Sequence, residues 1–336
     1  MEKCALREVF RANKVAAQLA TSPSAKLGLI AHSMLEEAAK GSIGDRPSFE
    51  ELWDANIGKI EEQMLDSMLD AHLVPLKDSA KNYEVKKLQA WNLISAEFIQ
   101  KRPTININNR IATEEWLQSR STRIAGRVDL LITDGERVDI IDYKTGSIFD
   151  ESGCPREEYL VQLKLYAALY HDNKEVWPTR LIIVGIDKTS YQIQYDPEEC
   201  EKLMAYFSNK LDAINKKIMD GVPNSELASP SPRTCRYCTY RPTCTMYWKT
   251  RVDSGEWPND VEGNIIEKTT SGIGLVRVVL ENAGNKYIVR GLTHRHNLGN
   301  RPTTRLVICN LTKDNISGQY VENKLTTCRI AAEDCK

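Results

Sequence analysis

The stretch GRVDLLITDGERVDIIDYKTG, residues 126–146, predicts the part of the fold around which the rest is built. Two apolar segments flank Asp134-Gly135, a dipeptide typical of the two-residue turn of a β-hairpin. The second segment ends in Asp142 and Lys144, where a buried strand meets a turn. A carboxylate and an ammonium group at the edge of a core call for a chemical explanation.

The predicted hairpin brings charged side chains from its two strands together. Asp129 lies at the start of the first strand and Asp142 at the end of the second, and antiparallel pairing makes these positions neighbours. Carboxylates are hard oxygen ligands of the kind that Mg²⁺ prefers. Lys144 shares a strand face with Asp142, where it could orient an attacking water or stabilise charge on a phosphoryl group. A surface hairpin with solvated charges is the alternative interpretation.

Hydrophobic periodicity on both sides of the hairpin indicates an α/β protein. Ser24 is a suitable N-cap for the first helix, and Gly41 ends it. We expect Glu114 or Glu115 to supply a third carboxylate from a helix before the hairpin. The predicted helices span 24–40, 49–72, 81–100, 157–171 and 197–219, and two further strands span 179–187 and 191–196.

The composition changes after residue 250 toward β-forming residues. We therefore predict one domain over residues 1–250, with a helical insertion at about 45–110 and a cysteine cluster at 235–244. A linker over 251–268 and a small β-rich domain over 269–336 follow, and an OB-like fold is one option for this domain.

Composition and charge restrict the class of protein. The net charge of -1 excludes a globally basic nucleic-acid-binding protein, so any such contact must use a local patch. The N-terminus has no apolar signal segment, and no apolar run approaches the ~20 residues needed to span a bilayer. We expect a cytoplasmic protein without a membrane anchor. A Walker A motif is absent, so any helicase or ATPase must be a separate partner.

The cysteines are unevenly spaced. Cys235, Cys238 and Cys244 form a C-x₂-C-x₅-C run, which leaves a tetrahedral metal site one ligand short. A zinc knuckle completed by a nearby residue and simple buried cysteines are both open. We expect no ligand role for the remaining cysteines at 154, 200, 309, 328 and 335.

Basic and aromatic residues alternate within the same segment. Such a pattern suits single-stranded DNA through phosphate pairing and base stacking, and a solvated loop is the alternative. The candidate DNA-binding residues are Arg236, Tyr237, Tyr240 and Arg241.

Four motifs, in order along residues 1 to about 250, resemble those of the PD-(D/E)XK nuclease superfamily and its RecB-like branch. LGLIAHSML is similar to the G-x-x-x-H helix and contains His32. GRVDLL is similar to the G-x-x-D motif, and IIDYKTG to the D-x-K-T-G motif. QLKLYAALY is similar to the Q-x-x-x-Y helix and contains Gln162 and Tyr166.

The resemblance implies a restriction-endonuclease-like core, in which helices flank a mixed sheet, and a set of site residues. Gln162 and Tyr166, one helical turn apart, would contact a metal-bound water and the nucleic-acid backbone. Of the two glutamates we prefer Glu115 as the third carboxylate. The implied ligands of Mg²⁺ or Mn²⁺ are His32, Glu115, Asp129, Asp142 and the carbonyl of Tyr143.

The RecB-like branch also implies an iron-sulfur centre. In AddB and the CRISPR-associated adaptation exonucleases, one cysteine before the early histidine helix and three after the nuclease core bind a [4Fe-4S] cluster. The corresponding positions are Cys4, Cys235, Cys238 and Cys244. Zinc is the less favoured alternative.

The expected activity is that of a metal-dependent deoxyribonuclease, which hydrolyses phosphodiester bonds in single-stranded DNA or at DNA ends. Endonuclease and exonuclease action are both open, as are roles in DNA repair, CRISPR adaptation and antiviral defence. The alternative is a non-catalytic DNA-binding or partner-binding subunit of a helicase–nuclease complex.

Overall fold

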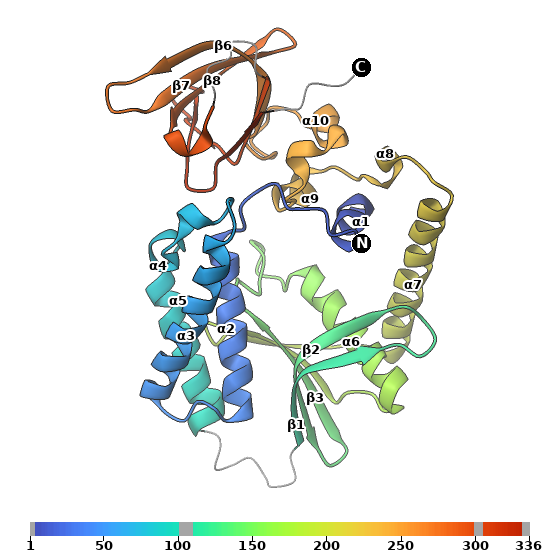
Figure 1. Ribbon diagram of the computed structural model, residues 1–336. Helices are drawn as coiled ribbons and strands as arrows, with labels where there is room; N and C mark the ends of the chain where they lie inside the picture. Colours follow the sequence, from blue (N-terminus) through green and yellow to red (C-terminus); the bar gives the residue numbers. More distant parts are fainter. Residues whose placement is uncertain (1–3, 101–109, 299–304, 331–336) are drawn as a thin grey trace. The chain divides into compact units, whose positions relative to one another are not determined.

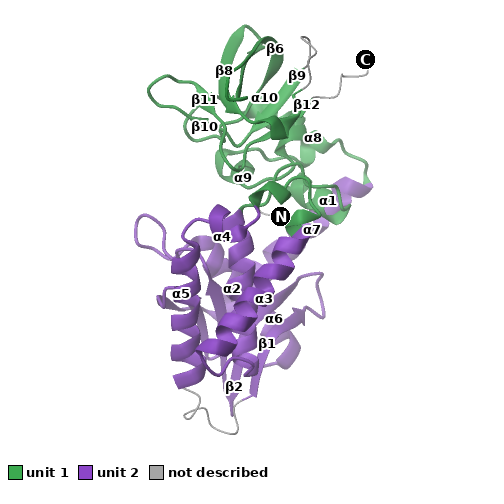
Figure 2. Ribbon diagram, turned by 60° about the vertical axis from the view of Figure 1, so that its left-hand side comes forward, with its two compact units in different colours: residues 1–22, 64–73, 220–336 green, residues 23–63, 74–219 purple. Residues whose placement is uncertain are grey.

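The computed structural model describes residues 4–100, 110–298 and 305–330. The chain forms two compact units, each assembled from segments that are distant in sequence (Figure 2). Unit 2 comprises residues 23–63 and 74–219, and unit 1 comprises residues 1–22, 64–73 and 220–336. This division differs from the boundary expected at residue 250, because the cysteine-rich segment at 235–244 belongs to unit 1.

Unit 2 contains a sheet of five strands in the order β1-β2-β3-β4-β5 (Figure 1). Strands β3 and β4 are parallel and the other neighbours are antiparallel. A parallel pair needs a long crossover connection, which α6 supplies here. The bounds are Arg110–Gln118 for β1, Ala125–Asp134 for β2, Arg137–Lys144 for β3, Arg180–Gly185 for β4, Ser190–Ile193 for β5 and Glu157–Lys174 for α6.

The predicted hairpin is confirmed as β2 and β3. Asp134 pairs with Arg137 across the turn, and Gly135 has the positive φ of 59° that such a turn requires. Leu130 lies opposite Ile141, so the same register brings Asp129 beside Asp142. The strand register predicted from the sequence therefore agrees with the structure.

Helices of unit 2 pack against the sheet and against one another. The apolar face of α6 packs on the strands through residues such as Leu163 and Ala167, together with Val128 and Ile140 of the hairpin. Helices α2, α3 and α5 lie side by side (Figure 1). The bounds are Pro23–Lys40 for α2, Arg46–Leu65 for α3, Leu76–Ser79 for α4, Tyr83–Ile94 for α5, Ser95–Gln100 for the π-helical turn η2 and Pro197–Met219 for α7.

The expectation of a helix around Glu114 and Glu115 is wrong, because these residues lie in strand β1. β1 is an edge strand that pairs only with β2. Edge strands tolerate charged side chains, which hid the alternating pattern of a strand in this segment. Ile111, Thr113 and Trp116 are residues that favour extended structure.

Unit 1 is built around a second sheet, with the order β10-β11-β8-β7-β6-β9-β12. Its core contains Val261, Leu280, Val289, Leu306 and Ile308. Strand β6 also begins inside the segment expected to be a linker at 251–268 and occupies its last part, from Val261 on. The bounds are Val261–Thr270 for β6, Val276–Asn282 for β7, Asn285–Leu292 for β8, Arg305–Cys309 for β9, Thr312–Lys313 for β10, Tyr320–Val321 for β11 and Thr327–Ile330 for β12.

The helices of unit 1 are short. They are α1 (Ala5–Ala12), η1 (Ala71–Leu73), α8 (Asn224–Leu227), α9 (Pro232–Arg236), η4 (Arg241–Thr243), α10 (Thr245–Thr250) and η5 (His294–His296).

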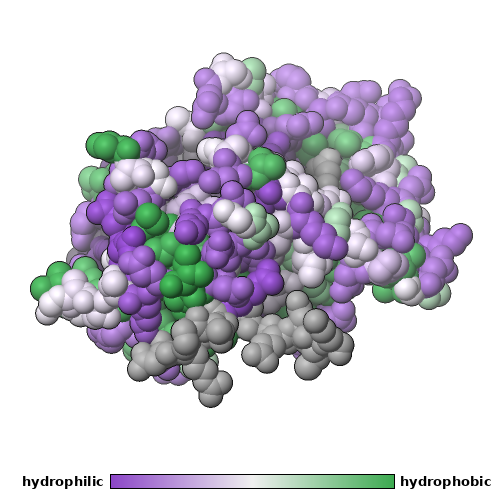
Figure 3. Space-filling model, turned by 90° about the horizontal axis from the view of Figure 1, so that it is seen from above, coloured by the Kyte–Doolittle hydropathy of each residue, from purple (hydrophilic) through white to green (hydrophobic). Residues whose placement is uncertain are grey.

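On the face drawn in Figure 3, hydrophilic residues predominate and hydrophobic ones form small patches. A search of the described ranges finds no helix with the length and apolarity to cross a membrane.

Candidate active site

Two carboxylates, one partly and one fully buried, lie side by side in the middle of β2 and near the end of β3. The Asp129 side chain is 18% exposed and that of Asp142 is 1% exposed. The backbone N–H of Tyr143 donates a hydrogen bond of 2.8 Å to Oδ2 of Asp129, which fixes the position of this carboxylate. Asp142 has no such support.

Both side-chain oxygens of Asp142 are buried without a hydrogen bond. An opposing charge is in contact, since Nζ of Lys144 lies 2.6 Å from Oδ2. Burial raises the pKa of Asp142 to about 6, against the effect of Lys144, and the charge of Asp129 adds to the rise. Burial likewise raises the pKa of Asp129 to about 6. Two carboxylates in this state would be stabilised by a cation.

Lys144 is held by side chains from α6. Its Nζ donates to Oε1 of Gln162 at 3.0 Å, and Nε2 of Gln162 donates to the Tyr166 hydroxyl at 2.8 Å. The ammonium also lies 4.8 Å from the centre of the Tyr159 ring, a cation–π distance. The chain of contacts fixes the ammonium against Asp142 and keeps it inside the site.

His32 reaches the site from α2. Its Nδ1 lies 3.6 Å from Oδ2 of Asp129. Burial, and then the positive charge of Lys144, lower the pKa of His32, which favours the neutral imidazole that can bind a metal. Gly28, one turn earlier, is required because a Cβ there would approach Oγ1 of Thr145 to 2.9 Å.

Glu114, rather than Glu115, lies on the wall of the small pocket at this site. His32, Asp129 and Tyr143 line the same pocket. The negative charge of Glu114 contributes to the raised pKa of Asp129, although burial contributes more. The preference for Glu115 is therefore corrected, because of the two glutamates only Glu114 lines the pocket.

The donor set fits a hard divalent cation in one respect. The oxygens of Asp142 lack hydrogen bonds although they are buried, and the partly buried carboxylate of Asp129 adjoins them. As they stand, no three His, Cys, Asp or Glu side chains of the described residues form a group that could hold a metal ion. The fit therefore rests on the chemistry of the carboxylates.

Comparison with known proteins agrees with this geometry. A sequence model of the PD-(D/E)XK nuclease superfamily matches residues 2–245. The chain belongs to this superfamily. Members are generally metal-dependent nucleases. A search of curated proteins finds no match.

Two solved structures resemble this nuclease-superfamily protein distantly. The protein in "Crystal structure of SSO0001" is 15% identical, with a TM-score of 0.28, and the match covers 72% of this chain and 95% of that one. A second, titled "Structural mimicry for functional antagonism", is 7% identical, with a TM-score of 0.22 and coverages of 69% and 100%.

The four cysteines expected to form a cluster all belong to unit 1. Cys4 precedes α1, Cys235 lies in α9, and Cys244 precedes α10 and accepts a hydrogen bond from the N–H of Tyr247. Burial raises the pKa of Cys235 to about 11, and the nearby Cys238, Cys244 and Cys4 raise it further. Cys4 thus contributes to the electrostatics of this segment, although among the described residues these cysteines do not form a group that could hold a metal ion.

Arg241 is not available to bind DNA, contrary to expectation. Its side chain is 3% exposed and forms an ion pair of 2.6 Å with the buried Asp260. Tyr240 packs edge-on against Phe10 at a ring separation of 5.3 Å. Arg236 is exposed, and Tyr237 is 79% exposed, so these two of the four candidates remain on the surface.

From the sequence, one residue of the site was named but not preferred, and one was missed. Glu114 was not preferred because a helix was expected there, and a helix gives no strand alternation from which to choose between adjacent glutamates. Tyr159 lies one turn before Gln162 on α6. Its helical spacing from Gln162 was the available signal, since i and i+3 residues share a face.

Proposed function

We propose that this protein is a divalent-metal-dependent deoxyribonuclease that hydrolyses phosphodiester bonds in single-stranded DNA or at DNA ends. The observation that carries the proposal is the buried carboxylate of Asp142, which lacks a hydrogen bond, beside Asp129. A fold that needed only stability would gain by replacing this group and its ion pair with Lys144 by apolar side chains, since removing paired charges from water is costly. Membership of the nuclease superfamily supports phosphodiester hydrolysis as the function of this site.

The side chains around the carboxylates suit this reaction. Lys144, fixed by Gln162, is positioned to orient a water or to stabilise negative charge that develops on a phosphate. Tyr166 restrains Gln162, and its own burial raises the pKa of its hydroxyl to about 12, so the hydroxyl stays protonated and able to donate. His32, held neutral, can serve as a ligand.

The proposed ion is Mg²⁺ or Mn²⁺. Asp129 and Asp142 would hold it, with Glu114, His32 and the carbonyl of Tyr143 as further candidate ligands. Bound there, such an ion supplies Lewis-acid polarisation of the phosphate and lowers the pKa of a bound water.

We also propose a [4Fe-4S] cluster on Cys4, Cys235, Cys238 and Cys244, with zinc as the alternative. The pKa of Cys235 and that of Cys238 are each raised in part by other cysteines of this set, which supports a common metal centre. Its role would be structural, because the cluster would tie the N-terminus to a segment more than 200 residues away. Exposed Arg236 and Tyr237 beside it offer a contact for single-stranded DNA.

The proposal is tested with end-labelled single-stranded DNA and Mn²⁺. Wild-type protein should degrade the DNA, and Asp142→Ala should reduce the rate by at least about 10³-fold, because the site loses a ligand. Asp139→Asn is the matched control. Asp139 lies on the same strand but pairs with Arg180, so its variant should cleave at close to the wild-type rate.

A second readout separates metal binding from cleavage. Mn²⁺ should raise the thermal stability of the wild type by preferential binding to the folded state, and it should not stabilise Asp142→Ala. Equal Mn²⁺ stabilisation of both proteins, or equal cleavage by both, would contradict the proposal.

A further inference from the structure

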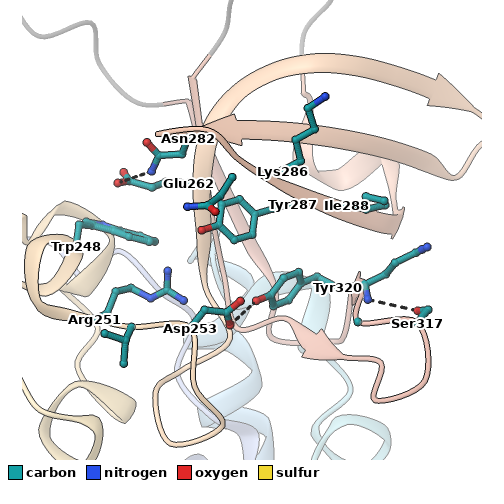
Figure 4. A pocket seen from close by; sticks show the side chains of 14 residues that line it. Trp248, Arg251, Asp253, Glu262, Asn282, Lys286, Tyr287, Ile288, Ser317 and Tyr320 are labelled. Atoms are coloured by element: carbon teal, nitrogen blue, oxygen red, sulfur yellow. Dashed lines mark hydrogen bonds between the residues drawn. The ribbon is translucent and has the colours of Figure 1, made fainter.

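A pocket in unit 1 lies between β8, the loop before β11 and the segment after α10 (Figure 4). Its volume is about 620 Å³. A cavity of this size is comparable to small-ligand sites, which span roughly 300–1,000 Å³. Nothing in the nuclease chemistry accounts for it.

Three aromatic side chains line the pocket. Tyr287 comes from β8 and Tyr320 from β11, with ring centres 6.3 Å apart and planes inclined by 58°. Trp248 of α10 lies on the opposite side in Figure 4. Aromatic faces open to a cavity are platforms on which planar ligands stack.

Two cations line the same pocket without a carboxylate partner. The guanidinium carbon of Arg251 lies 5.5 Å from the Trp248 ring, and its Nε is buried with no hydrogen-bond partner. Lys286 is exposed at the rim, and the described residues give it no ion pair. An arginine that is stacked on an aromatic ring, with a donor unused, is preorganised to bind an anion.

The two carboxylates of the pocket are already engaged. Asp253 accepts hydrogen bonds from Lys313 at 3.0 Å and from the Tyr320 hydroxyl at 2.9 Å. Glu262 pairs with Arg305 at 3.0 Å. The charges left for a ligand are therefore the two positive ones.

The remaining lining is mostly polar. Asn282, Asn285 and Gln319 present amides, whereas Val252 and Ile288 are the aliphatic residues of the lining. Amide groups suit the hydrogen-bonding edges of a base, and there is little aliphatic surface on which an apolar side chain of a protein partner could pack.

We propose that this pocket binds an unpaired nucleotide of single-stranded DNA. The base would stack on Tyr287 or Trp248, and the adjoining phosphate would contact Arg251 and Lys286. The inference rests on the proposed function in taking DNA as the ligand, and it adds a second binding site in a unit that lacks the active-site carboxylates.

The test measures binding of the full-length protein to a fluorescent oligothymidylate in EDTA, where no cleavage takes place. Lys286→Glu should weaken binding about fivefold and lower the salt dependence, because one phosphate contact is lost. Tyr287→Leu should weaken it about tenfold through lost stacking. Lys268→Glu is the matched control: it makes the same charge change on exposed β6, outside the pocket, and should bind like the wild type.

A photocrosslinking readout adds a signal that a merely structural role would not produce. An oligonucleotide with 5-iododeoxyuridine should crosslink to Trp248, Tyr287 or Tyr320. Leucine at 287 keeps apolar packing, and thermal unfolding checks the fold of each variant; if Tyr287→Leu does not fold, Lys286→Glu and the crosslink decide.

Three results would overturn the inference. They are wild-type affinity in Lys286→Glu, absence of DNA binding by the wild type in EDTA, and displacement of DNA by polyglutamate as effectively as by unlabelled DNA, which would assign the pocket to an acidic protein segment. Failure of the nuclease assay alone would not affect this result, since the binding test involves no cleavage.

Discussion

At the scale of single residues, Asp142 is where stability and chemistry oppose each other. Burial raises its pKa to about 6 from an ordinary 3.8, so the metal-free fold at pH 7 holds an unfavourable negative charge. We expect Asp142→Asn to raise the free energy of unfolding in EDTA by about 1–3 kcal/mol at pH 7 while abolishing cleavage. Urea denaturation measures the first effect, and DNA hydrolysis the second.

The stability that Asp142→Asn gains over the wild type should depend on pH. A carboxyl group whose pKa is raised on folding contributes most stability below its unfolded pKa near 3.9, and that contribution is lost as the pH rises through about 6. The advantage of Asp142→Asn should therefore shrink from pH 7 to pH 4.5. Asp139→Asn should show no such gain at pH 7, because this variant loses the ion pair between residue 139 and Arg180. A constant advantage across this range would contradict the assignment.

Lys144 and Gln162 should act as one unit. Gln162 accepts a hydrogen bond from Lys144 and lies farther along α6, so its effect on cleavage passes through the ammonium. We expect Lys144→Ala to lower the rate of cleavage by about 10²–10³-fold and Gln162→Ala by about tenfold. The double variant should be no slower than Lys144→Ala. Single-turnover rates on labelled DNA measure this, and additive losses would show that Gln162 acts independently.

Residue-level prediction succeeded where pairing fixes geometry and failed where a face had to be chosen. The turn Asp134-Gly135 sets the register that makes Asp129 and Asp142 neighbours. The choice between Glu114 and Glu115 needed the strand identity of β1, since a one-residue shift moves a side chain to the other face. Glu114 has a φ of 52°, an irregularity that sequence periodicity does not reveal.

At the scale of elements, apolar periodicity predicted the elements with strong patterns. The hairpin, α2 and α6 agree with expectation because each contributes many apolar residues to a core. β1 differs because it is an edge strand with charged residues, and such strands lack a clean alternation. Core elements are therefore read from sequence more securely than the edges that complete a site.

Gly28 couples α2 to the end of β3. A methyl group there would lie 2.9 Å from Oγ1 of Thr145, so Gly28→Ala should displace α2, with His32, from Asp129. Alanine gains about 1 kcal/mol of helix propensity, which offsets the strain, so stability should change little. Cleavage should fall about tenfold, because small misplacements of site groups are costly. Rates on labelled DNA and thermal unfolding measure the two effects.

Two further variants make this prediction specific. Gly58→Ala in α3 is the matched control, because a Cβ there meets no atom within 4 Å; it should stabilise the protein and leave cleavage unchanged. Thr145→Ala removes the Oγ1, and the double variant with Gly28→Ala should cleave at the rate of Thr145→Ala alone. If the double variant stays tenfold slower than Thr145→Ala, the close contact is not the cause.

At the scale of the whole molecule, composition did not reveal how the chain is divided. The β-forming residues after position 250 do form strands, but unit 1 also takes residues 1–22 and 64–73. Composition reports local structure, whereas membership of a unit depends on which distant segments pack together. The N-terminal segment and the C-x₂-C-x₅-C run share unit 1 because contacts such as Phe10 with Tyr240 join them.

The presence of the N-terminal segment and the C-x₂-C-x₅-C run in one unit leads to a prediction about the cysteines. If Cys4, Cys235, Cys238 and Cys244 hold a [4Fe-4S] cluster, anaerobically purified protein should be brown, with absorbance near ~400 nm. Cys4→Ser should lose much of this colour and lower the apparent Tm by about 5 °C or more, because the N-terminus is released. Cys154→Ser is the control: Cys154 is exposed in unit 2, and its variant should keep both properties. Colourless wild-type protein that contains zinc would replace the cluster with a zinc site, whereas an unchanged Tm in Cys4→Ser would remove Cys4 from the ligand set.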